Sequence, residues 1–456
     1  MRRILGGSLL AVLAAGVTYG AIVTEREQSY RDFVLQGDAA LARDDSYAAI
    51  EAFSVAISLK GDSMAAHLKR GEAYRRRHEY ESALRDLRRA AAIDPVSLYP
   101  RELLGDVHYG MAPREKGHAR ARYLRAIESY RDALAIDDRS ARIQYKLGLA
   151  AYRAGQLPVA VTALRQSIDL DPAFAEAHYL LGVCYRAMQQ PKEAFAALDR
   201  AVALDPAFVA AHEELADAYA RAGRQEDRLT HLKALAALEP GPVRERALAL
   251  GYARAGQLQQ ALLHLGSARQ SYPDDPETAL ALGQLWLERA AAGDRVELHK
   301  ALNALAAAVG PASSSDACTL YGRALLLSGN PVRAEQLFQQ AVTRFPVEPS
   351  AFLYLSDVSM RIGRRAAAHQ AIIDYAALVL SDTLSVPHLL RLADAQLAAG
   401  RREEARRSVE AALERDPGND AARTLSRRLQ APTAPSRVSA SPASGPRGRA
   451  DRRRES

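Results

Sequence analysis

A pattern that returns every 34 residues constrains this 456-residue chain more than any other feature. Its clearest copy, residues 175–208, fills small, aromatic, small, large, small and proline slots with Gly182, Tyr185, Ala194, Leu198, Ala201 and Pro206. Gly182 and Ala194 let a pair of antiparallel helices approach closely, Tyr185 and Leu198 fill the space beside that contact, and Pro206 ends the second helix. One copy cannot bury its own apolar faces. Copies must therefore stack, and the sequence predicts an elongated solenoid rather than a globule with one core.

Composition agrees with stacked helices. Alanine, leucine and arginine are abundant, aromatic residues make up 6% of the chain, and strand-type alternation of apolar and polar residues is missing. The length alone would suggest several domains, but internal repetition overrides that expectation because a solenoid grows without a central core. We therefore expect one long all-α repeat domain.

The recurring slots resemble the tetratricopeptide repeat, a helix-turn-helix unit. The resemblance covers residues 30–430 and implies an all-α, right-handed superhelical solenoid. The slots divide residues 30–419 into about eleven repeats: 30–63, 64–97, 98–140, 141–174, 175–208, 209–241, 242–275, 276–314, 315–348, 349–382 and 386–419. Residues 420–430 are expected to form a capping helix, because terminal repeats need a polar outer face to stay soluble.

Two of these repeats are longer than the period. In repeat 98–140 the second-helix markers, beginning with Ala126, arrive nine residues late. In repeat 276–314 about six extra residues fall around Gly293 and Asp294. Proline, glycine and charged residues interrupt the first insertion, which favours a lengthened loop over added core.

The N-terminus carries a pattern typical of membrane insertion. Arg2 and Arg3 precede an uncharged run over residues 4–24, long enough for a helix to cross a hydrocarbon core of roughly 30 Å. We expect residues 1–24 to be a signal-anchor and 25–29 a short juxtamembrane link. The positive-inside rule then predicts a single-pass protein of the cytoplasmic membrane with extracytoplasmic repeats, periplasmic in a bacterium. The alternative is a cleaved signal peptide and secretion, since small residues at Ala14 and Gly16, or Thr18 and Gly20, offer a cleavage site.

The C-terminal residues 431–456 are rich in proline, serine, alanine and arginine without apolar periodicity, so we expect a disordered tail. Six arginines against Asp451 and Glu455 give this tail +4 of the chain's net charge of +7. The rest of the chain is only mildly basic, which argues against a specific nucleic-acid-binding solenoid. Weak contact of the tail with an anionic surface is the expectation that its charge supports.

The sequence lacks the common motifs that carry chemistry. His212 and Glu213 begin a zinc-protease pattern, but Ala216 stands where its second histidine should be. Phosphate-loop, nucleophile-elbow and CxxC patterns are missing from the sequence. His178 and His212 occupy the same slot in successive repeats and are interpreted as structural, because a zinc site needs three or four converging ligands. We therefore expect no catalytic, cofactor-binding or metal-binding residues, no cofactor and no enzyme activity.

Cys184 and Cys318, the two cysteines of the chain, lie about four repeats apart, too far for a disulfide bond. We interpret both as small core residues.

In tetratricopeptide repeat proteins the first helices line a concave surface that binds partners. Carrying that pattern over slot by slot places a tyrosine-rich, basic-rimmed patch on three of these helices. Its members are Tyr109, Arg142, Tyr145, Leu149, Tyr152, Arg153, Tyr179, Val183 and Arg186. Tyrosine and arginine are favoured at interaction hot spots. The alternative is that these side chains pack between repeats.

These observations lead to a functional hypothesis. We expect a non-enzymatic, membrane-anchored scaffold that binds a protein or peptide in its concave groove during cell-envelope assembly or secretion. Two alternatives are a substrate-selecting subunit of an envelope enzyme complex and an adaptor whose repeats face the cytoplasm.

Overall fold

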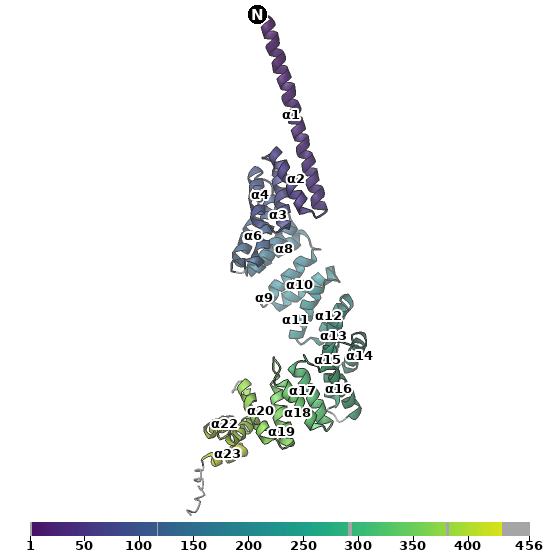
Figure 1. Cartoon of the computed structure of the whole chain (residues 1–456), viewed down its shortest axis with the longest axis vertical. Helices are drawn as coiled ribbons and strands as arrows, with labels where there is room; N and C mark the ends of the chain where they lie inside the picture. Colours follow the sequence, from purple (N-terminus) through teal and green to yellow (C-terminus); the bar gives the residue numbers. More distant parts are fainter. Residues whose placement is uncertain (1, 116, 291–293, 380–382, 431–456) are drawn as a thin grey trace, which may run out of the picture. The chain divides into compact units, whose positions relative to one another are not determined.

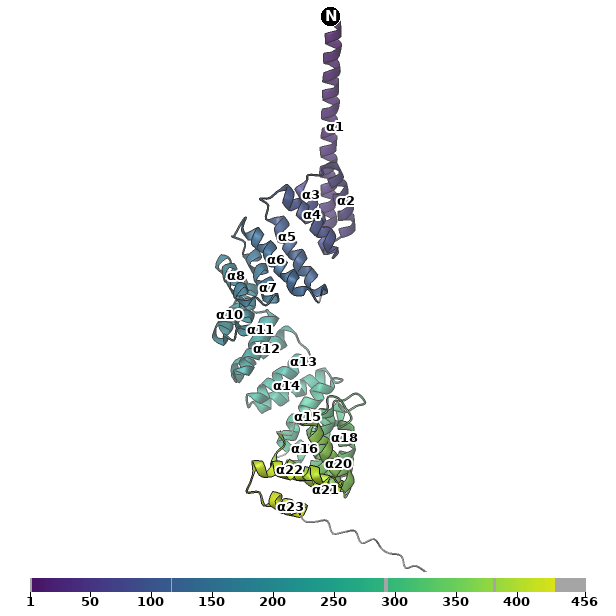
Figure 2. The same cartoon turned by 90° about the vertical axis from the view of Figure 1, so that its left-hand side faces the viewer.

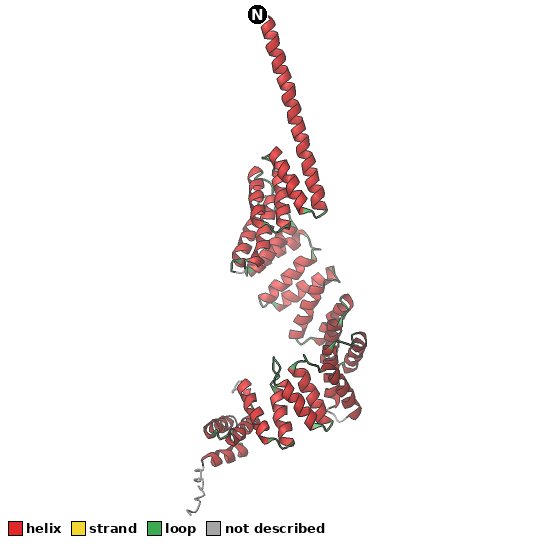
Figure 3. Cartoon of the chain, in the orientation of Figure 1, coloured by secondary structure: helices red, strands yellow, loops and turns green. Residues whose placement is uncertain are grey.

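The chain is helical throughout most of the computed structural model, which describes residues 2–115, 117–290, 294–379 and 383–430. Within these ranges the backbone forms α-helices, one short 3-10 helix and connecting turns, without strands (Figure 3). The predicted all-α tetratricopeptide-type solenoid is confirmed. The chain divides into two compact units, residues 1–256 and 257–456, which are described separately.

The first unit is a series of antiparallel helical hairpins (Figures 1 and 2). Each second helix of this unit packs against the first helix before it and against the first helix of the next hairpin. The helices are α1 (Arg2–Ala42), α2 (Ser46–Leu59), α3 (Met64–Arg76), α4 (Tyr80–Ile93), α5 (Tyr99–Met111), α6 (Ala119–Leu134), α7 (Ala141–Arg153), α8 (Leu157–Leu170), α9 (Ala175–Ala187), α10 (Pro191–Leu204), α11 (Val209–Arg221), α12 (Gln225–Leu238) and α13 (Pro242–Arg254).

Close approach of the two helices in a hairpin depends on glycine, as the repeat pattern predicts. A Cβ atom added to Gly182 would lie 2.6 Å from Cγ of Leu198, and one added to Gly148 would lie 2.7 Å from Cγ of Leu164. Both leucines are fully buried. Only glycine leaves room for the leucine of the second helix at this point, which explains why the two slots recur together.

The N-terminal prediction is wrong. Among the described residues, no helix has both the length and the apolar content needed to cross a membrane. This finding contradicts the single-pass membrane protein with extracytoplasmic repeats.

Residues 25–29 are also not a link, because they lie inside the 41-residue helix α1. Arg26 donates a hydrogen bond of 2.7 Å to the carbonyl of Leu59, and Glu27 pairs with Lys60 at 3.3 Å. Arg26 and Glu27, which the sequence pattern placed just outside a membrane, therefore contact the C-terminal end of α2.

The insertion in repeat 98–140 adds core as well as a loop. The chain continues from α5 into a 3-10 helix, η1 (Ala112–Arg114), before α6 begins. Met111 and Ala112 are buried. Glu115 accepts two hydrogen bonds of 2.8 Å from Arg122, which fixes the insertion to α6.

The second unit repeats the hairpin arrangement. Its helices are α14 (Leu258–Ser271), α15 (Pro276–Ala290), α16 (Arg295–Ala308), α17 (Ser315–Leu327), α18 (Pro331–Ala341), α19 (Ser350–Arg361), α20 (Arg365–Leu378), α21 (Val386–Ala398), α22 (Arg402–Arg415) and α23 (Asp420–Gln430). The glycine contact recurs here, since a Cβ on Gly322 would lie 2.6 Å from Cε1 of Phe338. The insertion expected in repeat 276–314 falls partly outside the described residues, and Asp294 caps the N-terminus of α16.

The last helix, α23, packs against α22. It buries Ala422, Leu425 and Leu429. Ala421 is exposed. The tail 431–456, expected to be disordered, lies outside the described residues.

Candidate functional site

The nine residues of the expected interaction patch lie on α5, α7 and α9, the first helices of three consecutive hairpins. Arg142 and Arg153 are exposed, whereas Val183 is only 5% exposed and belongs to the core. The others are half-buried. We call the eight residues other than Val183 the tyrosine patch: Tyr109, Arg142, Tyr145, Leu149, Tyr152, Arg153, Tyr179 and Arg186.

Two tyrosines of the patch make the same contact one repeat apart. The ring of Tyr145 lies 4.9 Å from that of Phe174, and the ring of Tyr179 lies 4.9 Å from that of Phe208, in tilted arrangements. Each phenylalanine immediately precedes the next first helix. One side of each tyrosine therefore packs against the phenylalanine at the end of its own repeat, and the side chain as a whole is half-buried. Burial raises the pKa of both phenols, so they are neutral hydrogen-bonding groups at ordinary pH.

A third tyrosine is held by its neighbours. The Tyr109 ring lies 5.3 Å from that of Tyr123 on α6. Burial raises the pKa of Tyr109, and a hydrogen bond with Arg153 opposes part of that rise. Arg153 thus links the end of α7 to α5.

Carboxylates compensate part of the basic rim. Glu102, only 4% exposed, pairs with Arg142 and Lys146 at 2.8 Å each. Lys146 also lies 2.7 Å from Asp106. Arg186 pairs with Glu214 on α11, with Nε 3.2 Å from Oε2. Sequence reasoning missed these ion pairs because the partners belong to different repeats, so the patch is less basic than its arginines suggest.

The histidines have structural contacts, as predicted. His178 Nε2 lies 3.2 Å from the carbonyl oxygen of Pro172, and His212 Nε2 lies 3.1 Å from that of Pro206. His212 additionally places Nδ1 3.0 Å from Nδ1 of His231 on α12, a partner that the sequence pattern did not reveal. Within the described part of the chain, no group of three or more His, Cys, Asp or Glu side chains is arranged to hold a metal ion.

Both cysteines are buried and unbonded, which agrees with their interpretation as core residues. Burial raises the pKa of the Cys184 thiol to about 12, which keeps it protonated and unreactive.

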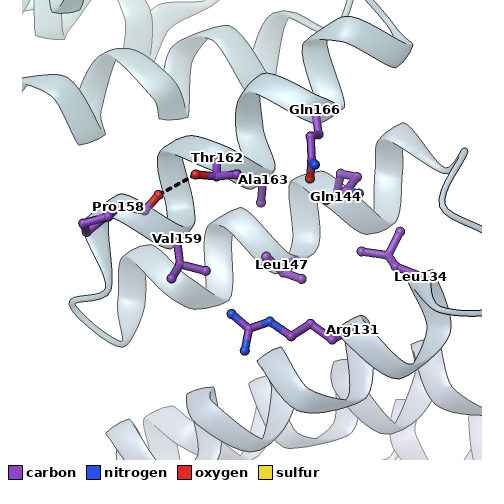
Figure 4. Close-up of a pocket in the computed structure, with 9 residues that line it drawn as sticks. All are labelled: Arg131, Leu134, Gln144, Leu147, Pro158, Val159, Thr162, Ala163 and Gln166. Atoms are coloured by element: carbon purple, nitrogen blue, oxygen red, sulfur yellow. Dashed lines mark hydrogen bonds between the residues drawn. The ribbon is translucent and has the colours of Figure 1, made fainter.

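Four cavities adjoin the helices of the patch. One of about 590 Å³ lies between α8, α9 and α10, and one of about 330 Å³ is lined by Tyr179 together with residues of α11, α12 and α13. A third, of about 410 Å³, is lined mainly by α6, α7 and α8 and has Arg131 at its edge beside Leu147 and Val159 (Figure 4). It contains no residue of the tyrosine patch. The fourth, of about 670 Å³, lies between α9, α10 and α11 and includes Arg186 of the patch in its lining.

Comparison with known families agrees with this hairpin geometry. The tetratricopeptide repeat model matches residues 34–97, 119–161, 145–207, 291–349, 319–378 and 390–426, which together make up more than half of the chain. The chain belongs to the tetratricopeptide repeat family. Proteins of this family are generally scaffolds for protein interactions. No curated protein sequence matches the chain.

Several solved tetratricopeptide repeat structures resemble part of the chain. A crystal structure of MamA is 22% identical and covers 37% of this chain and 94% of its own, with a TM-score of 0.34. PilF of Pseudomonas aeruginosa is 21% identical and covers 47% of this chain and 94% of its own, with a TM-score of 0.37. YrrB, described as a TPR protein with an unusual peptide-binding site, is 20% identical and covers 43% of this chain and 96% of its own, with a TM-score of 0.36.

Proposed function

We propose that this tetratricopeptide repeat protein is a non-enzymatic scaffold that binds a protein or peptide through the tyrosine patch on α5, α7 and α9. The observation that supports it most is the repeated pair of half-buried tyrosines, Tyr145 and Tyr179, each braced by a phenylalanine at 4.9 Å. A braced ring loses little conformational entropy on binding, and its hydroxyl still offers directional hydrogen bonds. The envelope role expected from the sequence depended on the membrane anchor and is not part of this proposal.

The half-burial of these rings decides which variants are informative. Complete removal of a buried aromatic side chain costs about 3–5 kcal/mol, so truncating a half-buried tyrosine to alanine should cost about 2 kcal/mol. Loss of binding by such a variant would be confounded with loss of folding. Tyr145→Phe combined with Tyr179→Phe keeps both ring contacts and removes only the hydroxyls.

The test begins with selection of peptides from a random displayed library on the full chain. Affinities of the selected peptides are then measured by fluorescence anisotropy. The double phenylalanine variant should bind at least about fivefold more weakly, the loss of about one hydrogen bond, with an unchanged thermal melt. Tyr47→Phe is the matched control, because Tyr47 on α2 is 71% exposed and lies outside the patch. Failure to select any peptide, or peptides indifferent to Tyr145 and Tyr179, would contradict the proposal.

A further inference from the structure

The cavity between α9, α10 and α11, which we call the α9–α11 cavity, has a volume of about 670 Å³. The last helical residue of α3, α7, α11 and α13 is an arginine: Arg76, Arg153, Arg221 and Arg254. In α9 the corresponding residue is Ala187, which lines the cavity. Ala187 therefore presents a shorter side chain at this slot than the arginines of the other four helices.

The walls of the cavity are apolar and fixed. Ala194 and Leu198 of α10 are 4% and 0% exposed. Phe195 is half-buried, and its ring lies 4.7 Å from that of Tyr219. Ala218 of α11 and Ala222, which caps the C-terminus of that helix, complete the lining with small side chains. A preformed apolar hollow of this volume lies within the range of roughly 300–1,000 Å³ typical of ligand sites.

The charge of the cavity has one sign. Its ten lining residues include Arg186 and Arg221 but no aspartate or glutamate. Arg221 is exposed, and the described residues provide it with no hydrogen bond or ion pair. Arg186 already pairs with Glu214 and donates a hydrogen bond of 3.3 Å from Nη2 to Oε1 of that residue, whereas its buried Nε makes no hydrogen bond. The two guanidinium groups come from the C-terminal ends of different helices, α9 and α11, and both line the cavity.

We propose that the α9–α11 cavity anchors a peptide segment in which an apolar side chain is flanked on both sides by aspartate or glutamate. The apolar side chain enters between Phe195 and Ala218, and the flanking carboxylates meet Arg186 and Arg221. Cations on two separate helices favour two separated carboxylates, which an internal acidic segment supplies and a single C-terminal carboxylate does not. This inference rests on the proposed function and extends it, because Arg186 belongs to both the tyrosine patch and the cavity.

The probe for the test is a fluorescent synthetic peptide with a central Leu-Phe pair, glutamates on both sides and an amidated C-terminus. Replacing Leu-Phe by Ser-Ser should weaken binding about tenfold or more, because the burial of an apolar side chain is lost. Replacing the glutamates by glutamines should weaken binding about fivefold, and added salt should have a similar effect. A peptide without glutamates but with a free C-terminal carboxylate should bind no better than the glutamine peptide. Equal binding by that peptide would overturn the proposed chemistry.

Two protein variants and one control locate the binding. Arg221→Glu should weaken binding of the glutamate peptide about fivefold or more and strengthen binding of a lysine-flanked peptide. Unfolding would not produce this reversal of preference. Ala187→Gln places a neutral side chain over the cavity, at a slot where longer arginines are tolerated in neighbouring hairpins, and should also weaken binding. Arg139→Glu is the control, because Arg139 is exposed and does not line the cavity.

Photo-crosslinking identifies where on the chain the peptide binds. With benzoylphenylalanine in place of the central phenylalanine, crosslinks on the full chain should map to Ala187–Leu198 or Ala218–Ala222. Crosslinks elsewhere, or binding indifferent to Arg221→Glu and Ala187→Gln, would overturn the inference. If library-selected peptides depend on Tyr145 and Tyr179 while the probe does not bind, the scaffold function stands and the cavity proposal fails. If neither class of peptide binds, both fail.

Discussion

Gly182→Ala should destabilise the hairpin of α9 and α10 although alanine is the better helix former. The new Cβ would lie 2.6 Å from Cγ of Leu198, 3.0 Å from its Cδ2 and 3.2 Å from the carbonyl oxygen of Ala194. Carbon atoms in favourable contact are about 3.5–4.0 Å apart, so the overlap approaches 1 Å. Leu198 is fully buried and the carbonyl belongs to the helix backbone, so neither neighbour has room to move.

The net effect follows from two opposed terms. Overpacking of a core typically costs about 1–3 kcal/mol. Alanine in place of glycine within a helix stabilises the helix by about 1 kcal/mol. Because Leu198 is fully buried, we expect the cost of overpacking to lie near the upper end of this range. The free energy of unfolding should therefore fall by about 1–2 kcal/mol.

Gly266→Ala is the matched comparison. Gly266 lies within α14, and no heavy atom falls within 4 Å of an added Cβ. Without overlap, this variant should gain about 1 kcal/mol from helix propensity alone. The same glycine-to-alanine substitution is therefore expected to lower the free energy of unfolding in α9 and to raise it in α14.

Urea unfolding followed by circular dichroism measures the overall change, and amide hydrogen exchange assigns it to particular helices. Exchange should accelerate in α9 and α10 of Gly182→Ala and slow in α14 of Gly266→Ala, because repeats contact mainly their neighbours. A Gly182→Ala protein as stable as the parent would refute the close-approach explanation of the repeat pattern.

Three further predictions concern single positions. Gln189 has a φ of 59°, so Gln189→Gly should raise the free energy of unfolding by about 0.5–1 kcal/mol in urea melts. Burial and His212 lower the pKa of His231 to about 4 from 6.5, so unfolding takes up protons between these values. The free energy of unfolding should fall as pH decreases through that window, and His231→Gln should flatten the profile in melts at several pH values. Arg364→Ala should cost about 3 kcal/mol in denaturant melts, because Glu335, 1% exposed, loses its 2.7 Å ion pair.

Much of the fold could be predicted because the repeat slots have local physical causes. The pairing of Gly182 with Leu198 requires two helices in contact, and the same slots reappear wherever the period holds. The N-terminus could not be predicted in the same way. An uncharged run indicates where a helix can form, but the contacts of Arg26 and Glu27 with the end of α2 depend on tertiary packing.

The candidate site was predictable only in outline. The slots located Tyr145 and Tyr179 on first helices, but they could not show that each ring is half-covered by a phenylalanine from the end of its own repeat. The Glu102–Lys146 pair joins residues 44 positions apart and leaves no local signal.

The neighbour-to-neighbour packing of the hairpins also affects how the chain acquires its structure. In each unit, the helices in contact are adjacent or nearly adjacent in sequence. Closing such short loops costs little chain entropy, and proteins rich in local contacts fold rapidly. The helices that contact the α3–α4 hairpin most, namely α2 and α5, are synthesised before α9. The chain is therefore suited to acquiring structure progressively during translation, with little need for distant segments to find one another.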